Sequence, residues 1–289
     1  MHAINYEAPN TVQDAVKLLA QLGERGRPIC GGTDLIIQLR AGVRRPDCVV
    51  DVKNIADLRH ISFDPNKGLR LGAAVPAIEI FENAEVRRRY PGLTEAAHLI
   101  GSLQIQSRAS VGGNLCNGSP AADTTPALIA LSARARVAGP KGEREVKVEE
   151  FCVSPGRTVL APGEILVELL INAPKPHSSD AYLRFIPRNE MDIAVVGVGS
   201  CLQMDGDKVT AARIGLGAVA ATPLFAAKAS ESLVGKKLDD AAIAQAAKLA
   251  TEQATPIDDM RGTAEFRRHL VGVLTKRTLL NAAERARAA

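Results

Sequence analysis

The chain has 289 residues, of which 46% are hydrophobic and 24% are charged, so it can bury a core in one large domain or in two of ordinary size. Its formal net charge of +4 is small for this length, and it has 3% aromatic residues and no Trp. This composition argues against a basic or base-stacking surface for nucleic acid.

Cysteine and histidine usage argues against a metal centre in this chain. The five cysteines form no C-x-x-C pair, and the five histidines are scattered without ligand spacing. An odd number of cysteines also fits a reducing compartment. No apolar run of about 18 residues is present, and Met1-His2-Ala3 does not begin a basic-then-apolar leader. These features predict a cytoplasmic protein without a membrane span.

The first part of the chain has the pattern of a β-α-β unit. Thr11 is the expected N-cap of its first helix, with Asp14 as the capping-box partner. The double glycine Gly31-Gly32 falls at a strand-to-helix turn, and Thr33 is expected to cap the helix that follows. The predicted elements are a helix over 11–23, a strand over 27–30, a helix over 34–40 and a strand over 48–52.

The middle of the chain is predicted to combine short strands, helices and a hairpin. Strands are expected over 55–62, 69–74, 134–138, 143–148 and 165–171. Helices are expected over 76–83, 94–100 and 124–131. The charged run Arg87-Arg88-Arg89 is interpreted as a solvated face. The glycine-rich stretch 110–123 is expected to be a loop that leads into the last of these helices.

A polar, proline-rich stretch at 173–179 is the best candidate linker. Beyond it the pattern predicts three antiparallel strands and then three helices, which is an α+β arrangement. The strands are expected over 181–186, 193–204 and 208–219, and the helices over 223–233, 239–253 and 263–287. The predicted domains are two subdomains over 1–54 and 55–175 and a C-terminal domain over 176–289.

The chemistry of the chain is concentrated in two glycine motifs. One is Cys30-Gly31-Gly32-Thr33-Asp34, and the other begins at Ser110-Val111-Gly112-Gly113-Asn114. Glycines let a ligand approach the backbone, and N–H groups ahead of a helix bind anions. Two such motifs facing each other could hold a pyrophosphate, and Asp123 could accept hydrogen bonds from ribose hydroxyls. The chain contains no G-x-G-x-x-G and no P-loop motif.

These motifs, with Ser119-Pro120-Ala121-Ala122-Asp123 and the segment from Arg184 to Ala194, resemble the FAD-binding medium subunit of molybdenum hydroxylases. The resemblance covers nearly the whole chain and includes the carbon monoxide dehydrogenase medium subunit and the xanthine dehydrogenase flavin domain. It implies an FAD-binding PCMH or vanillyl-alcohol-oxidase type of fold. Two N-terminal α/β subdomains would be followed by a C-terminal domain with a three-stranded antiparallel sheet and a helical bundle.

The resemblance also implies which residues contact FAD. The pyrophosphate would lie against Ile29, Cys30, Gly31, Gly32, Thr33, Asp34 and Leu35 and against Ser110, Val111, Gly112, Gly113 and Asn114. Ser119 and Asp123 would hold the adenosine side. Ile100, Leu166 and Arg184 would lie near the flavin, with Arg188 and Asp192 as a neighbouring charged pair that could equally be structural. Cys116 is interpreted as a packing residue rather than a reactive thiol.

The function implied by the resemblance is electron transfer within a larger oxidoreductase. A large subunit would hold the molybdenum cofactor, and a small subunit would hold [2Fe-2S] clusters that pass electrons to FAD, in a dimer of heterotrimers. On this interpretation no side chain of this chain is catalytic toward the primary substrate and none binds a metal. Two alternatives stay open, a self-contained flavin oxidase and a flavin-free assembly subunit. The substrate and the final acceptor are also left open.

Overall fold

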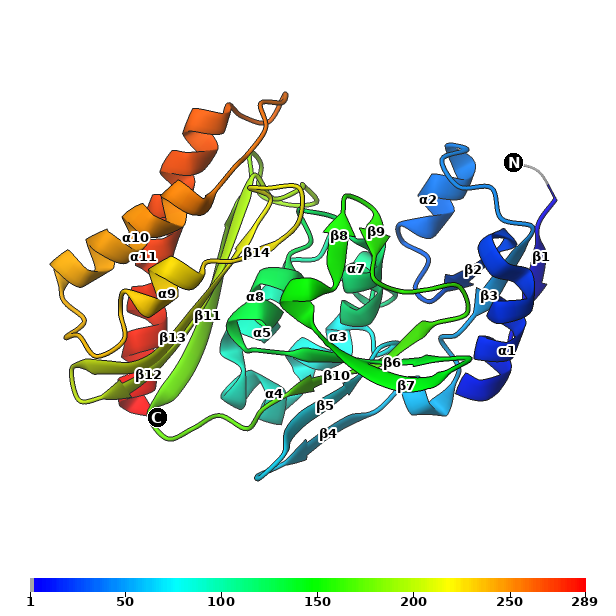
Figure 1. Ribbon diagram of the computed structural model, residues 1–289, viewed down its shortest axis with the longest axis horizontal. Coiled ribbons are helices and arrows are strands. Elements are labelled where there is room, and N and C mark those ends of the chain that lie inside the picture. The colour runs from blue at the N-terminus through cyan, green and yellow to red at the C-terminus, as the bar shows by residue number, and fades with distance from the viewer. Residues whose placement is uncertain (1–2) are drawn as a thin grey trace.

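The computed structural model describes residues 3–289. Met1 and His2, at the start of the segment compared with a leader peptide, lie outside the described residues. Figure 1 shows a small sheet near the N-terminus, a central sheet, and a C-terminal domain at the opposite end of the molecule. This arrangement of two N-terminal α/β subdomains and a C-terminal domain is the mixed fold that the sequence predicts. Among the described residues, no helix is long and apolar enough to cross a membrane.

The N-terminal sheet is parallel, with the strand order β1-β3-β2. Its strands are β1 (Asn5–Glu7), β2 (Gly26–Ile29) and β3 (Cys48–Asp51). Helix α1 (Val12–Leu22) packs on this sheet through the predicted apolar stripe. Thr11 Oγ1 accepts a hydrogen bond from the Asp14 backbone N–H at 3.1 Å, which confirms the predicted cap. Strand β1 has only three residues, all exposed, so the sequence shows no apolar pattern that would predict it.

Helix α2 (Leu35–Arg40) lies where the sequence predicts it, but its cap differs from the prediction. The residue before the helix is Asp34, and no side chain caps the helix, so the prediction for Thr33 is wrong. Instead, the Ile36 N–H donates to the Gly32 carbonyl at 3.0 Å. None of the residues of α2 is buried, so its position depends on the loops at its ends.

The central sheet is antiparallel and has the strand order β4-β5-β10-β6-β7. Its strands are β4 (Ile61–Asp64), β5 (Gly68–Gly72), β6 (Arg134–Gly139), β7 (Gly142–Lys147) and β10 (Ile165–Ile171). The strand expected from residue 55 begins only at Ile61, because residues 56–58 form a 3-10 turn that buries Leu58. A short ribbon of β8 (Cys152–Ser154) and β9 (Arg157–Thr158) precedes β10.

The chain between β5 and β6 is helical throughout most of its length. Its helices are α3 (Ala77–Glu82), α4 (Ala84–Arg89), α5 (Pro91–His98), α6 (Leu103–Gln106), α7 (Val111–Asn117) and α8 (Thr124–Ala130). Arg88 and Arg89 at the end of α4 form ion pairs with Glu85, on a largely exposed face as predicted. Helices α5 and α8 face the C-terminal domain, and α7 packs against β10.

The C-terminal sheet has four antiparallel strands rather than the three predicted. They are β11 (Ser178–Phe185), β12 (Val196–Asp205), β13 (Lys208–Gly217) and β14 (Leu224–Phe225). The two residues of β14 belong to the segment predicted as a helix over 223–233, so helix α9 is shortened to Ala227–Glu231. Helices α10 (Asp240–Gln253) and α11 (Ala264–Ala288) follow as predicted.

Both faces of the C-terminal sheet are covered. On one face, Ser200 and Thr278 of α11 form a buried hydrogen bond of 2.7 Å. The next residue along β12, Gly199, pairs with Gly215 of β13 and points to the opposite face. A Cβ on Gly199 would lie 2.7 Å from the carbonyl oxygen of Pro126, so the strand backbones rest directly on helix α8. This close approach fixes the C-terminal domain against the central one.

Strand β10 contains an irregularity that decides where Glu168 points. Leu166 pairs with Val137 of β6, but Glu168 pairs with Arg136, the adjacent residue of that strand, so a β-bulge separates the two positions. As a result Leu166 and Glu168 face opposite sides of the sheet, although their spacing would place them on one side of a regular strand. Leu166 joins the core, and Glu168 is directed toward cationic side chains.

The carboxylate of Glu168 is fully buried and has three cationic or basic neighbours on three strands or their ends. Arg70 donates to it at 2.9 and 3.0 Å, Arg136 lies at 2.7 Å and His60 Nε2 at 2.8 Å. Burial by itself raises the pKa of Glu168, but hydrogen bonds from Arg70 and His60 and the charge of Arg136 outweigh it, so the pKa is lowered. The carboxylate of Glu168 on β10 is thus bound to an arginine of each neighbouring strand, Arg70 of β5 and Arg136 of β6.

We expect Glu168→Gln to lower the free energy of unfolding by about 2–3 kcal/mol, because it leaves Arg70 and Arg136 without their shared counter-charge. Urea unfolding at pH 7 measures this. The control is Glu145→Gln, which removes a half-exposed ion pair with Arg134 on the same sheet and should cost less than about 1 kcal/mol. Equal losses for both variants would contradict a special role for Glu168.

Candidate functional site

The two glycine motifs lie against each other in the structure. Gly31 follows β2 and packs on the backbone of Arg108, so closely that a Cβ would overlap the carbonyl oxygen of Arg108. Next to this contact, the Ser110 hydroxyl lies 3.6 Å from the Cys30 sulfur. The end of β2 and the segment that leads into α7 therefore lie in direct contact.

The second motif is helical, although the sequence predicts a loop. Helix α7 begins at Val111, and Ser110 caps it by accepting a hydrogen bond from the Gly113 N–H at 3.0 Å. It ends at Gly118, whose φ of 65° is the left-handed conformation favoured by glycine. A capping serine before the apolar residues Val111 and Leu115 is the local signal for this helix, and the two glycines weaken it.

The glycines of the two motifs serve different purposes. Gly112 is buried, and a Cβ there would lie 2.5 Å from the carbonyl oxygen of Ala73, so it is needed for packing. Gly32 has a φ of 76° and is needed for the turn into α2. Gly113 has only the Ser110 hydroxyl within 4 Å of an added Cβ. Of the four, Gly113 is thus the one whose open side lets a ligand approach the backbone.

The residues after α7 are tied to α8 and to the C-terminal domain. Asn114 Oδ1 accepts a hydrogen bond from the Thr124 hydroxyl at 2.7 Å, which links the starts of α7 and α8. The Pro120 carbonyl accepts from the Ala218 N–H at 2.7 Å. Ser119 is half-buried, and its hydroxyl accepts from the Ala121 N–H at 3.3 Å.

Asp123 is buried, with 8% of its surface exposed, and it is bound by two side chains of β11. Its Oδ1 accepts from the Tyr182 hydroxyl at 2.9 Å, and its Oδ2 accepts from Arg184 Nη1 at 2.7 Å. Burial raises the pKa of Asp123 to about 6, against the opposing effects of Arg184 and Tyr182. The family resemblance implies a position near the flavin for Arg184, but nothing in the sequence predicts its bond to Asp123 or a role for Tyr182.

The remaining predicted residues lie around this centre. Ile100 follows α5, and Leu166 lies on β10; both are buried in the apolar cluster that also contains Val111 and Leu115 of α7. Arg184 Nε is buried and has no hydrogen-bond partner among residues 3–289. An unpaired guanidinium N–H of this kind is a donor that a ligand can use.

Other groups singled out in the sequence have structural surroundings. Burial raises the pKa of Cys116 to about 12, so its thiol stays protonated at neutral pH, in agreement with a packing residue. Arg188 lies 3.6 Å from Asp192, which also approaches Arg261 at 3.8 Å. In the part of the chain that the structure describes, no group of three or more His, Cys, Asp or Glu residues is arranged to hold a metal ion.

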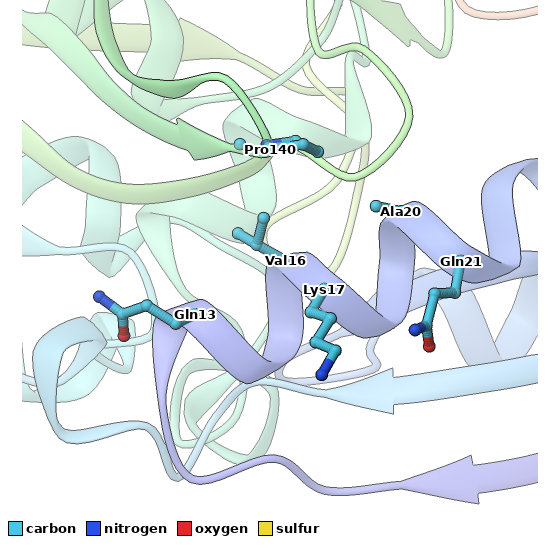
Figure 2. Close-up of a pocket in the computed structure, with 7 residues that line it drawn as sticks. Gln13, Val16, Lys17, Ala20, Gln21 and Pro140 are labelled. Carbon is cyan, nitrogen blue, oxygen red and sulfur yellow. The ribbon is translucent and has the colours of Figure 1, made fainter.

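Figure 2 shows a shallow groove elsewhere on the molecule, between α1 and the β6–β7 turn. Its volume is about 490 Å³, and it is lined by Gln13, Val16, Lys17, Ala20, Gln21, Gly139 and Pro140. None of the predicted site residues lines it. The groove is therefore separate from the two glycine motifs at 30–34 and 110–114.

A second polar contact joins the domains beside Asp123. Asp180 of β11 is 2% exposed, and its Oδ2 accepts from the Leu93 N–H at the start of α5 at 3.1 Å. Its Oδ1 has no partner within the described residues. Burial raises the pKa of Asp180 to about 7, despite the hydrogen bonds from Gly92 and Leu93.

Comparison with known proteins matches each of the two parts of the chain to a protein family. Residues 2–174 match the family model described as the FAD binding domain in molybdopterin dehydrogenase. Residues 181–282 match the CO dehydrogenase flavoprotein C-terminal domain. Among relatives, the carbon monoxide dehydrogenase medium chain of Afipia carboxidovorans is 33% identical, over 99% of this chain and 98% of the relative. The putative xanthine dehydrogenase FAD-binding subunit of Escherichia coli is 30% identical, over 96% and 95%.

Solved structures show the same similarity. A chain of reconstituted CO dehydrogenase from Oligotropha carboxidovorans superimposes with a TM-score of 0.95 at 33% identity, covering 98% of this chain and 99% of that one. A chain of quinoline 2-oxidoreductase from Pseudomonas putida superimposes with a TM-score of 0.90 at 31% identity, covering 99% and 98%. The likeness therefore includes both domains and the way they are joined.

We expect the contribution of Asp180 to the free energy of unfolding to fall as the pH rises from about 4 to 7, because its pKa is raised in the folded state and that state binds the proton more tightly. Asp123 acts in the same direction up to about pH 6. Asp180→Asn should remove this contribution, which amounts to about 2–4 kcal/mol over that pH range. Urea unfolding from pH 4 to pH 8 measures it.

The matched control for this experiment is Asp57→Asn, which changes an exposed carboxylate. It should keep the wild-type pH dependence. The prediction fails if the Asp180→Asn and wild-type slopes coincide.

Proposed function

The chain belongs to the FAD-binding medium subunits of the molybdenum hydroxylases, and from this we propose that it takes electrons from iron–sulfur clusters of a partner subunit and passes them from FAD to an external acceptor. The observation that carries the proposal is the contact of the Gly31 and Ser110 motifs, which leaves Gly113 open beside it. The names of the relatives, "medium chain" and "FAD-binding subunit", favour this over a self-contained flavin oxidase.

Two further observations support FAD as the ligand of these residues. Arg184 carries a buried N–H without a partner, and Asp123 is a carboxylate with acceptor positions beyond its two hydrogen bonds. We propose that the pyrophosphate is held by residues 29–35 and 110–114, and the adenosine side by Ser119 and Asp123. Ile100 and Leu166 would then lie on the flavin side, and Arg184 would lie beside Asp123, to which it is bonded at 2.7 Å.

Bound FAD supplies the ability to collect single electrons and release them in pairs. The residues of this chain bind and orient it. The backbone at Gly113 has only the Ser110 hydroxyl beside it, and this hydroxyl caps the helix and holds that backbone in place. Asp123 would accept hydrogen bonds from the ribose, and Arg184, which is bonded to it, balances its charge. In this proposal no side chain here acts as an acid, base or nucleophile on the primary substrate.

We propose that the partners are a large subunit with the molybdenum cofactor and a small iron–sulfur subunit, assembled as a dimer of heterotrimers. The subunit names of the relatives support a multi-subunit assembly. All five cysteines are free, which supports a reducing compartment such as the cytoplasm.

The complex purified with this chain should show the absorbance bands of a flavin and release FAD on denaturation, in near-stoichiometric amount with the chain. An absorbance spectrum and chromatography of the released cofactor make the measurement. A complete, folded complex without flavin would overturn the proposal and favour a flavin-free assembly subunit.

Gly113→Val should weaken FAD binding at least tenfold, because the new side chain occupies the open side of the cradle, while the apo chain remains folded. Gly112→Val is the contrasting variant, since its Cβ would press on Ala73 and lower stability in the absence of FAD. Fluorescence titration with FAD and urea unfolding separate the two effects. Wild-type affinity in Gly113→Val would show that the pyrophosphate lies elsewhere.

A further inference from the structure

Tyr182 links the C-terminal domain to the proposed FAD site through both its backbone and its side chain. The residue lies on β11 and is 1% exposed. Its hydroxyl donates to Asp123 Oδ1 at 2.9 Å, and its backbone N–H donates to Glu95 Oε2 at 2.9 Å. Asp123 and Glu95 both belong to the FAD-binding part of the chain. One residue of the C-terminal domain thus contacts two carboxylates across the domain boundary.

The ring of Tyr182 is held rigidly. It forms a small buried cluster with Ala96 of α5 and Ala127 of α8, so it lies between these helices and its own sheet. On the neighbouring strand, Gly197 leaves room for the phenol, because a Cβ there would lie 2.5 Å from the hydroxyl oxygen. This packing directs the hydroxyl toward Asp123, to which it donates a hydrogen bond.

The hydrogen bonds at Asp123 leave acceptor capacity for a ligand. A carboxylate can accept about four hydrogen bonds, and the structure gives it one from Tyr182 and one from Arg184. Each of its oxygens is thus oriented by one donor of β11. Arg184 contributes charge, whereas Tyr182 contributes an uncharged donor on a ring that is buried against Ala96 and Ala127.

We propose that Tyr182 is a positioning residue of the FAD site, which holds the Asp123 carboxylate in the orientation and charge state that receive the ribose hydroxyls of FAD. Docking of the C-terminal domain is then coupled to FAD binding, although Tyr182 itself does not touch the cofactor. This inference rests on the proposed function, because it takes Asp123 as a group on the adenosine side.

The coupling follows from linkage. Whatever stabilises the domain contact at Tyr182 raises FAD affinity, and FAD in turn stabilises the contact by the same factor. Tyr182→Phe keeps the ring and removes the donor, so Asp123 loses a hydrogen bond to its charged form. FAD affinity should fall roughly tenfold, because Asp123 loses one of the two donors that orient it.

The test compares Tyr182→Phe with Tyr90→Phe in the full chain by fluorescence titration with FAD. Tyr90 is the matched control because it is also 1% exposed and donates its hydroxyl to a carbonyl, that of Asn172, at 2.9 Å. Tyr90→Phe should keep wild-type affinity. In an Asp123→Asn background, Tyr182→Phe should have no further effect on FAD affinity, because the residue acts through Asp123.

The pH dependence of FAD affinity distinguishes a positioning role of Tyr182 from a purely structural one. The ionisable groups that face Asp123 are Arg184 and Tyr182. Removing the Tyr182 hydroxyl takes away a hydrogen bond to the charged form, so the pH at which FAD affinity is lost on acidification should shift upward. In Tyr90→Phe this midpoint should stay at the wild-type value.

Hydrogen exchange in the unmodified chain tests the coupling even if Tyr182→Phe fails to fold. FAD should slow exchange of the Tyr182 amide, whose partner is Glu95 across the boundary. The inference is overturned if wild-type binds FAD but FAD leaves this amide unprotected, or if Tyr182→Phe and Tyr90→Phe bind FAD equally well. Failure of the proposed function would appear differently, as a wild-type chain and complex that bind no FAD.

Discussion

The two domains of this protein meet at a buried carboxylate, and much of the structure is arranged to satisfy it. Asp123 lies at the start of α8 in the FAD-binding part, but its hydrogen-bond donors, Tyr182 and Arg184, lie on β11 of the C-terminal domain. A buried charge without donors is strongly destabilising, so the domain that supplies them is required for the site. The C-terminal domain is therefore a structural component of the proposed cofactor site.

Close backbone packing makes this arrangement possible. Gly199 and Gly215 of the C-terminal sheet rest on Pro126 of α8, and Gly31 rests on Arg108 where the N-terminal subdomains meet. With 3% aromatic residues, the chain has few large side chains to fill gaps, so its layers approach through glycine and alanine. Gly31 and Gly112 of the two motifs pack against neighbouring backbone, whereas Gly113 has only the Ser110 hydroxyl beside it.

The two functions of the chain, binding FAD and joining the domains, use the same short stretch of sequence. Residues 110–123 contact the first glycine motif at one end and the C-terminal sheet at the other. A cofactor held along this stretch would contact all three parts of the molecule. Such an arrangement suits a subunit whose task is to bind and orient a flavin, because loss of the cofactor and loosening of the domains are linked.

The sequence by itself determined the fold class, most of the elements, and both glycine motifs. Local signals sufficed for α1, with its Thr11 cap, and for helices α10 and α11. It did not determine that α7 is a helix, that β10 carries a bulge, or that Tyr182 and Arg184 bind Asp123. Those outcomes depend on residues far apart in the chain: Gly112 packs on Ala73, and Asp123 lies 59 positions from Tyr182. Only the tertiary structure decides them, because a buried carboxylate selects its donors by proximity in space and leaves no periodic pattern in the sequence.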